Sequence, residues 1–243
     1  IEAAIKYFLV QAAASALVLF SSVSNAWSTG QWDITQLTHP PSCTLLTTAI
    51  AIKLGLAPFH FWFPEVLQGS SLTTALLLST VMKLPPTIIL ILTSHSLNPT
   101  LLTTMSITSI ALGGWMGLNQ TQTRKILAFS SISHLGWMTT IIIFNPKLTL
   151  LTFYTYILMT TSIFLTMNTT NALKLPTLMT SWTKTPTLNT TLMLTLLSLA
   201  GLPPLTGFLP KWLIIQELTK QEMAMTATAI SLLSLLGLFF YMR

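Results

Sequence analysis

Three lysines stand inside strongly apolar stretches of the sequence: Lys53, Lys83 and Lys211. A lysine at the centre of a bilayer costs about 2.5–3.5 kcal/mol on insertion scales, so each one needs a compensating role. Apolar surroundings disfavour the charged form, and a lysine there can release a proton that it would hold in water. Two histidines in similar stretches, His60 and His134, can pass protons in either direction. These five residues together predict a proton relay.

Depth within each run separates these side chains from charges that simply reach water. Lys53 lies about ten residues, or about 15 Å, into its run, which is too deep for a lysine stem to reach an interface. Lys83 is about as deep, and two prolines follow it closely in the sequence. Lys211 is nearer to the end of its run, so an interfacial position remains an alternative. For His60 and His134 the alternative is a neutral imidazole bonded to a neighbouring hydroxyl.

The composition identifies the surroundings of these residues as a membrane. Only 7% of the residues are charged and 51% are hydrophobic, with a mean hydropathy of +0.71, whereas soluble domains carry about 25% charged residues. The net charge of +6 is scattered, which argues against nucleic-acid binding. Cys43 is the single cysteine, and no phosphate-binding loop, dinucleotide motif or metal-ligand spacing occurs. We therefore expect no metal, no cofactor and no bond-breaking catalytic residue in this chain.

The apolar runs predict an all-α integral membrane protein with about eight transmembrane helices. A bilayer core needs roughly 20 apolar residues per helix, and the runs are too long for barrel strands. The expected spans are about 3–26, 43–66, 71–92, 99–118, 124–144, 148–168, 189–216 and 223–242. We expect residues 1–243 to form a single transmembrane domain. Since the chain starts with Ile1 and stops at Arg243 directly after an apolar run, we expect further N-terminal helices and a further C-terminal segment.

Alternating spans place the loops on two sides of unequal charge. One side collects Lys6, Arg124, Lys125, Lys174, Lys184 and Arg243. The other collects Lys147 and Lys220, beside Asp33, Glu217 and Glu222. The positive-inside rule directs the first side toward the cytoplasm or the mitochondrial matrix.

A short motif occurs twice, at an offset of 146 residues. From Gly55 the sequence reads GLAP, five residues, then PE; from Gly201 it reads GLPP, five residues, then PK. Each copy interrupts an apolar span, and the two spans run in opposite directions, as in transporters with inverted repeats and broken helices. We expect residues 1–118 to form mostly the first repeat and residues 119–243 mostly the second. Glu65, which closes the first copy, is a possible further member of the relay.

Four segments carry a resemblance to a known family: IEAAIKYFLVQAAASA, AIKLGLAPFHFWFPEVLQG, LNQTQTRKILAFSSISHLGWM and LAGLPPLTGFLPKW. The whole chain resembles the antiporter-like membrane subunits of respiratory complex I, with the same order and spacing of these segments. The resemblance implies inverted five-helix repeats, each with a discontinuous helix, and a hydrophilic axis at mid-membrane. It implies that Lys53 is the central proton-holding lysine, Lys83 the connecting residue and Lys211 the terminal lysine. His134 falls on the helix that helps to wet the axis.

The resemblance also implies a location and a set of partners. The chain would lie in the mitochondrial inner membrane among other membrane-arm subunits and lipids such as cardiolipin, with Arg124, Lys125, Lys174 and Lys184 facing the matrix. FMN, iron–sulfur clusters, NADH and ubiquinone would be used by other subunits. The family pairs its first lysine with a glutamate on an earlier helix, and Glu2 does not fit that place. Two alternatives remain: a stand-alone cation/proton antiporter of the same fold, and a structural subunit that does not pump.

Overall fold

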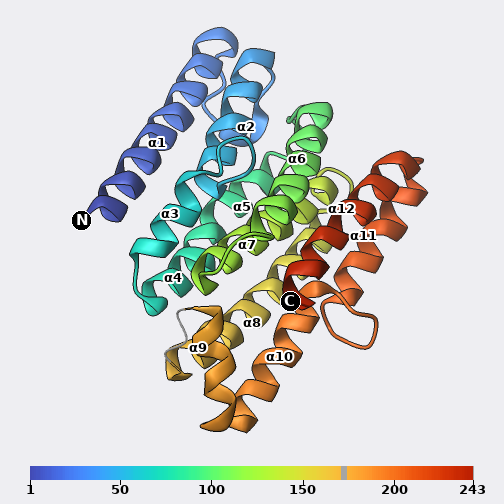
Figure 1. Ribbon diagram of the computed structural model, residues 1–243. Coiled ribbons are helices and arrows are strands. Elements are labelled where there is room, and N and C mark those ends of the chain that lie inside the picture. The colour runs from blue at the N-terminus through green and yellow to red at the C-terminus, as the bar shows by residue number, and fades with distance from the viewer. Residues whose placement is uncertain (171–173, 243) are drawn as a thin grey trace.

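Helices make up nearly all of the regular structure in the computed structural model, which describes residues 1–170 and 174–242 (Figure 1). In chain order they are α1 (Glu2–Thr29), α2 (Pro40–Leu54), α3 (Trp62–Gly69), α4 (Leu72–Ser79), α5 (Leu84–Leu92), α6 (Pro99–Gly117), α7 (Thr123–Ile141), α8 (Pro146–Thr170), α9 (Leu175–Thr180), α10 (Pro186–Ala200), α11 (Phe208–Lys220) and α12 (Ala224–Met242). Short 3₁₀ turns occur at Ile34–Gln36, Val81–Lys83 and Ser181–Thr183. The prediction of an all-α chain is confirmed over the described residues.

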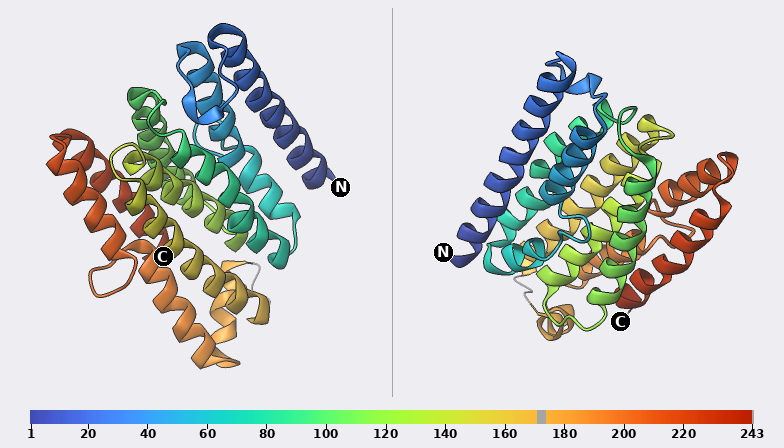
Figure 2. Two further views of the ribbon diagram at one scale, coloured as in Figure 1. Left: turned by 180° about the vertical axis from the view of Figure 1, so that it is seen from behind. Right: turned by 90° about the horizontal axis from the view of Figure 1, so that it is seen from above.

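Most residues of each predicted apolar run are helical, although three of the runs are interrupted. Four helical segments, Glu2–Thr29, Leu72–Leu92, Pro146–Thr170 and Ala224–Met242, are long and apolar enough to cross a membrane by themselves. Two further runs are each divided between two helices, α2 with α3 and α10 with α11. The helices lie roughly side by side, with α1 at one edge of the bundle and α11 and α12 at the other (Figures 1 and 2).

Glycine ends the first half of both divided helices. Gly55 follows α2 with φ of 74°, and Gly201 follows α10 with φ of 86°. This left-handed conformation is easy for glycine, and it lets the glycine N–H bond back to carbonyls of the last helical turn. The Gly55 N–H donates to the Ala51 carbonyl, and the Gly201 N–H donates to the Leu197 carbonyl. The two breaks predicted from the repeated motif are therefore confirmed.

A third interruption falls at Lys83. Helix α4 stops at Ser79, the 3₁₀ turn Val81–Lys83 follows, and α5 starts at Leu84. Pro85 and Pro86 have no N–H group to continue the helical ladder, so carbonyls near Val81 lose their usual donors. The prolines thus loosen the helix at the turn that carries Lys83.

The side predicted to be positive is assembled at one end of the bundle, where α1 starts and α12 ends (Figure 2). Lys6 forms an ion pair of 2.5 Å with Glu65 there. The Arg124 guanidinium donates to the carbonyl of Ser70, which follows α3. Gln122 and Lys174 form an isolated β-bridge. Arg243, also predicted for this side, lies outside the described residues.

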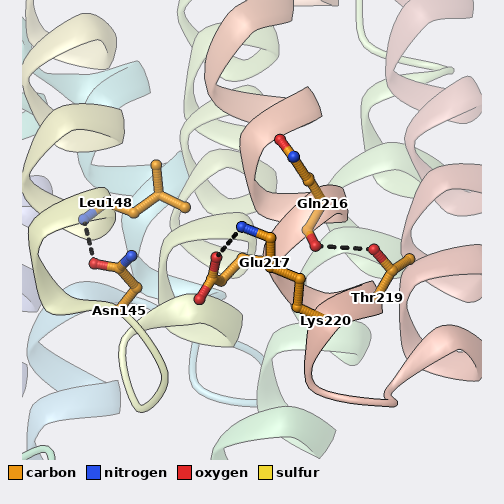
Figure 3. Close-up of polar contacts among 6 residues, drawn as sticks. All are labelled: Asn145, Leu148, Gln216, Glu217, Thr219 and Lys220. Carbon is orange, nitrogen blue, oxygen red and sulfur yellow. Dashed lines mark hydrogen bonds and ion pairs between the residues drawn. The ribbon is translucent and has the colours of Figure 1, made fainter.

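Figure 3 shows local polar contacts at the opposite end, among them a hydrogen bond of 2.8 Å from the Thr219 hydroxyl to the Gln216 carbonyl. The Asn145 side chain accepts a hydrogen bond of 3.2 Å from the Leu148 N–H in the first turn of α8. Glu217 and Lys220 form an ion pair of 3.7 Å within α11. A Lys–Glu pair at this spacing, with Lys220 62% exposed, contributes little to stability.

Helix α7 is the centre of the apolar packing. Leu127 and Ile132 belong to one buried cluster, Leu135 and Met138 to a second, and Trp137 with its neighbours to a third. Because α7 contributes to all three clusters, its position fixes the relative positions of the surrounding helices. His134 is on this helix.

Gly207 provides a test of how tightly the second break is packed. A β-carbon at this position would lie 1.7 Å from the Ser198 carbonyl oxygen. We expect Gly207→Ala to destabilise the folded subunit by about 3 kcal/mol, the upper end of ordinary overpacking costs, measured by thermal unfolding of the purified complex. Gly237→Ala is the matched control, because the nearest atom there is 3.7 Å away. Equal losses in the two variants would contradict the packing argument.

Candidate functional site

The ammonium group of Lys211 lies against the end of α10. Its Nζ donates to the Ala200 carbonyl at 2.8 Å and to the Leu199 carbonyl at 3.4 Å. The Trp137 ring centroid lies 6.0 Å from the same nitrogen. The last carbonyls of a helix carry partial negative charge and lack partners of their own. Lys211 therefore satisfies the open end of a helix that stops inside the bundle.

Two glycines make room for this arrangement. A β-carbon at Gly201 would lie 2.9 Å from both Cδ and Nζ of Lys211. Gly207 lets the loop between α10 and α11 fold back onto the Ser198 carbonyl. The Lys211 side chain thus packs directly on the backbone of Gly201, where any other residue would place a β-carbon. Gly201 of the repeated motif and Gly207 after it are therefore needed for the position of the lysine as well as for the turn.

Lys83 is held in a different way. Its side chain is only 3% exposed, and its Nζ has no hydrogen-bond partner within the described residues. The nitrogen lies 4.4 Å from the centroid of the Phe63 ring and 5.6 Å from that of Tyr156. Aromatic faces attract a cation, but they do not replace the acceptors that an ammonium group has in water. Lys83 is therefore a buried cation site without an oxygen ligand.

Tyr156 and His134 fill the space between the two lysines. The rings of His134 and Tyr156 lie 5.6 Å apart between centroids, and the Tyr156 hydroxyl donates to the Ser79 carbonyl, at the end of α4, at 3.4 Å. Tyr156, His134 and Lys211 line one cavity of about 20 Å³, enough for about one water molecule. The structure thus brings Lys83, His134 and Lys211 into one row, with Tyr156 as the link.

The other predicted relay residues lie outside this row. Lys53 is in the last turn of α2 and half-buried, and it lines none of the cavities that contain His134 and Lys211. His60 is 1% exposed, with Nε2 3.2 Å from the Met116 sulfur. Glu65 is exposed and paired with Lys6. Each of these roles remains a prediction.

Two tyrosines of the site had no clear signal in the sequence. Tyr156 is fully buried between Lys83 and His134, whereas Tyr154 on the same helix is 63% exposed. Tyr241 on α12 lines a second cavity with His134 and Lys211. Both tyrosines lie in apolar helices without a distinct polar face, so periodicity alone could not assign their direction. The only available hint was that a buried tyrosine hydroxyl usually has a polar function or partner.

The side chains of the site are of types that can hold and pass protons. Lysine, histidine and tyrosine side chains meet in small cavities of the bundle, and no cluster of three or more His, Cys, Asp or Glu side chains occurs among residues 1–170 and 174–242. Buried ionisable groups on broken membrane helices are typical of proteins that move ions or protons across a membrane. Fold and site together define a multi-pass membrane protein of this class.

Comparison with known proteins defines the class more narrowly. The model of the family described as NADH:quinone oxidoreductase/Mrp antiporter, transmembrane, matches residues 1–237. The chain belongs to this family. It is 80% identical to NADH-ubiquinone oxidoreductase chain 2 of Struthio camelus, over all of this chain and 70% of that protein. It is 74% identical to the protein of the same name from Coturnix japonica, with the same coverage.

Solved structures share the fold. A chain of respiratory complex I from Thermus thermophilus superimposes with a TM-score of 0.90 at 29% identity, covering 100% of this chain and 58% of that one. A chain of the Mrp complex from Dietzia sp. has a TM-score of 0.85 at 18% identity, covering 99% of this chain and 49% of its own length. The chain thus spans a little over half of the Thermus thermophilus chain and about half of the Dietzia chain. The expected antiporter-like fold is confirmed.

Replacing Lys83 tests whether its buried ammonium group stabilises or destabilises the fold. Because its ammonium is buried without an acceptor, we expect Lys83→Met to leave the folded subunit as stable as before or up to about 3 kcal/mol more stable, the cost of a lysine at mid-membrane. Thermal unfolding of the purified complex measures the change. Lys6→Met, which removes an exposed partner of Glu65, is the control and should change stability little. A strong loss of stability in Lys83→Met would mean that its ammonium has a ligand.

Proposed function

We propose that this chain translocates protons across the mitochondrial inner membrane as an antiporter-like subunit of respiratory complex I. The observation that carries the proposal is the row Lys83, Tyr156, His134 and Lys211, which crosses the bundle from the α4–α5 interruption to the α10–α11 break. The 80% identity to a NADH-ubiquinone oxidoreductase chain 2 supports the assignment to that complex. Partner subunits carry the electrons from NADH to ubiquinone with their FMN and iron–sulfur clusters.

The contacts of the two lysines suggest the direction of proton movement. At Lys83 an ammonium group meets aromatic faces, whereas at Lys211 it meets two carbonyl oxygens at the end of a helix. Hydrogen bonds that involve a charged donor are stronger than neutral ones. A proton that moves from Lys83 to Lys211 gains oxygen ligands, and His134 with a water in the shared cavity provides the intermediate step.

Lys53 is the proposed entry to this row. It precedes the first break, and movement of a nearby charge in the assembled complex would make it release its proton toward Lys83. Lys211 follows the second break and would release its proton when it is repelled by the next one. His60 and Glu65 are secondary candidates for proton transfer, because His60 contacts the Met116 sulfur and Glu65 pairs with Lys6.

The two breaks also support an inverted repeat in one transmembrane domain. The offset of 146 residues maps α2 onto α10 residue for residue and the start of α3 onto the start of α11. Residues 1–118 then hold most of the first repeat and residues 119–243 most of the second. The end of the bundle with Arg124, Lys125, Lys174 and Lys184 faces the matrix under this proposal, and cardiolipin is an expected lipid partner.

Replacing the terminal lysine tests the function. We expect Lys211→Gln in the assembled complex to lower the number of protons translocated per electron pair, because the carbonyls of α10 lose their cation. Lys53→Ala should do the same if the relay starts there. Lys147→Ala is the control, since Lys147 is exposed at the start of α8. The measurement is proton uptake against NADH oxidation in sealed vesicles.

The alternatives give different results in the same experiment. A structural role predicts that Lys211→Gln prevents assembly while the complex that survives pumps normally. A stand-alone antiporter predicts sodium- or potassium-dependent transport by the purified full-length chain. Normal numbers of protons per electron pair in both the Lys53 and the Lys211 variants would refute the proposed relay.

A further inference from the structure

The indole of Trp62 holds the end of α2 at the first break. Its Nε1–H donates to the Ile52 carbonyl at 3.1 Å, beside the Gly55 N–H, which donates to the same oxygen at 3.2 Å. A β-carbon on Gly55 would lie 3.6 Å from Cζ2 of the indole, so the ring packs directly against the turn. A helix that ends inside a membrane needs such donors, because no water reaches its last carbonyls. Trp62 thus supplies a neutral donor from the far side of the break.

The repeated motif has a different donor at its second copy. At the offset that relates the two copies, Trp62 corresponds to Phe208, whose side chain has no N–H group. Lys211 corresponds to Glu65, whose carboxylate pairs with Lys6. The end of α2 therefore receives an indole and the end of α10 receives an ammonium group. The donors come from different positions of the motif, so the turn itself does not dictate which kind of donor is present.

Lys53 lies one residue beyond the carbonyl that the indole holds. It is half-buried in the last turn of α2. Lysine side chains near a helix C-terminus can bind the last carbonyls, and a charged donor forms a stronger hydrogen bond than a neutral one. Lys211 makes such contacts with the end of α10. The indole occupies an acceptor for which the Lys53 ammonium group would otherwise compete.

The same indole also contacts the surroundings of Lys83. Its ring lies 5.5 Å from the Phe63 ring between centroids, at 79°, which is an edge-to-face arrangement. The Phe63 ring in turn lies 4.4 Å from the Lys83 Nζ. Trp62 therefore lies between the helix end that carries Lys53 and the aromatic face that meets Lys83.

We propose that Trp62 is a positioning residue for Lys53: its indole N–H occupies the end of α2, so the Lys53 ammonium group stays available for proton exchange with Lys83. Lys211 binds the end of α10 itself and holds its proton against two carbonyls. The neutral donor thus accompanies the lysine that gives up a proton, and the charged donor is the lysine that receives one. This inference rests on the proposed function, in which Lys53 is the entry of the relay.

Trp62→Phe tests the inference, because it removes the N–H and keeps an aromatic ring. We expect the assembled complex to oxidise NADH but to translocate fewer protons per electron pair, with a loss as large as that of Lys53→Ala. The reason is that the Lys53 ammonium group then binds the end of α2 and retains its proton. Trp212→Phe is the matched control, since Trp212 on α11 is 54% exposed.

A second pair of variants separates the donor from the ring. Trp62→Gln and Trp62→Met have side chains of similar length, but only glutamine can donate a hydrogen bond. We expect the Gln variant to translocate more protons per electron pair than the Met variant, whereas a role of the ring in packing alone would lower both equally.

Three results would overturn the role of Trp62 while leaving the relay in place. They are equal proton numbers in the Gln and Met variants, loss of assembly in all three Trp62 variants, and normal proton numbers in Trp62→Phe while Lys53→Ala and Lys211→Gln are impaired. Normal proton numbers in Lys53→Ala and Lys211→Gln would instead overturn the proposed function.

Discussion

The second break depends on the mutual satisfaction of one cation and one helix end. Helix α10 stops inside the bundle, where its last carbonyls have no water, and Lys211 has a charge that is equally costly there. The ammonium group donates to the Leu199 and Ala200 carbonyls, so the carbonyls gain a donor and the cation gains acceptors. The left-handed Gly201, the close approach of Gly207 and the position of Trp137 all serve this contact. The cavity shared with His134 follows from the same geometry.

At the first break, neutral side-chain donors satisfy the last carbonyls of α2. The Trp62 indole N–H donates to the Ile52 carbonyl at 3.1 Å, and the Gln11 amide donates to the Lys53 carbonyl at 3.5 Å. The Lys53 side chain is thus not needed to satisfy its own helix end. The residue that corresponds to Lys211 in the repeated motif is Glu65, and it points to the surface. The two breaks have the same backbone conformation at their glycines, but only the second has a cation on its helix end.

Local chemistry explains which parts of this fold could be predicted from the sequence. Glycine and proline act through their own backbone preferences, so the breaks after Leu54 and Ala200 and the interruption near Lys83 were readable. The direction of a side chain depends on neighbours far away in the sequence. Tyr154 and Tyr156 are two positions apart, yet one is exposed and the other lies fully buried between Lys83 and His134. Helix α8 has no distinct polar face, so its sequence does not indicate which side is buried.

The contact between Arg124 and Ser70 has a mechanical consequence. It fastens the C-terminal end of α3 to the first turn of α7, with a cation satisfying the carbonyl of the residue that follows α3. Helix α3 also carries Phe63, which touches Lys83, and α7 carries His134. The guanidinium couples the two helices, so a displacement of α3 at the first break would be transmitted to the helix that carries His134.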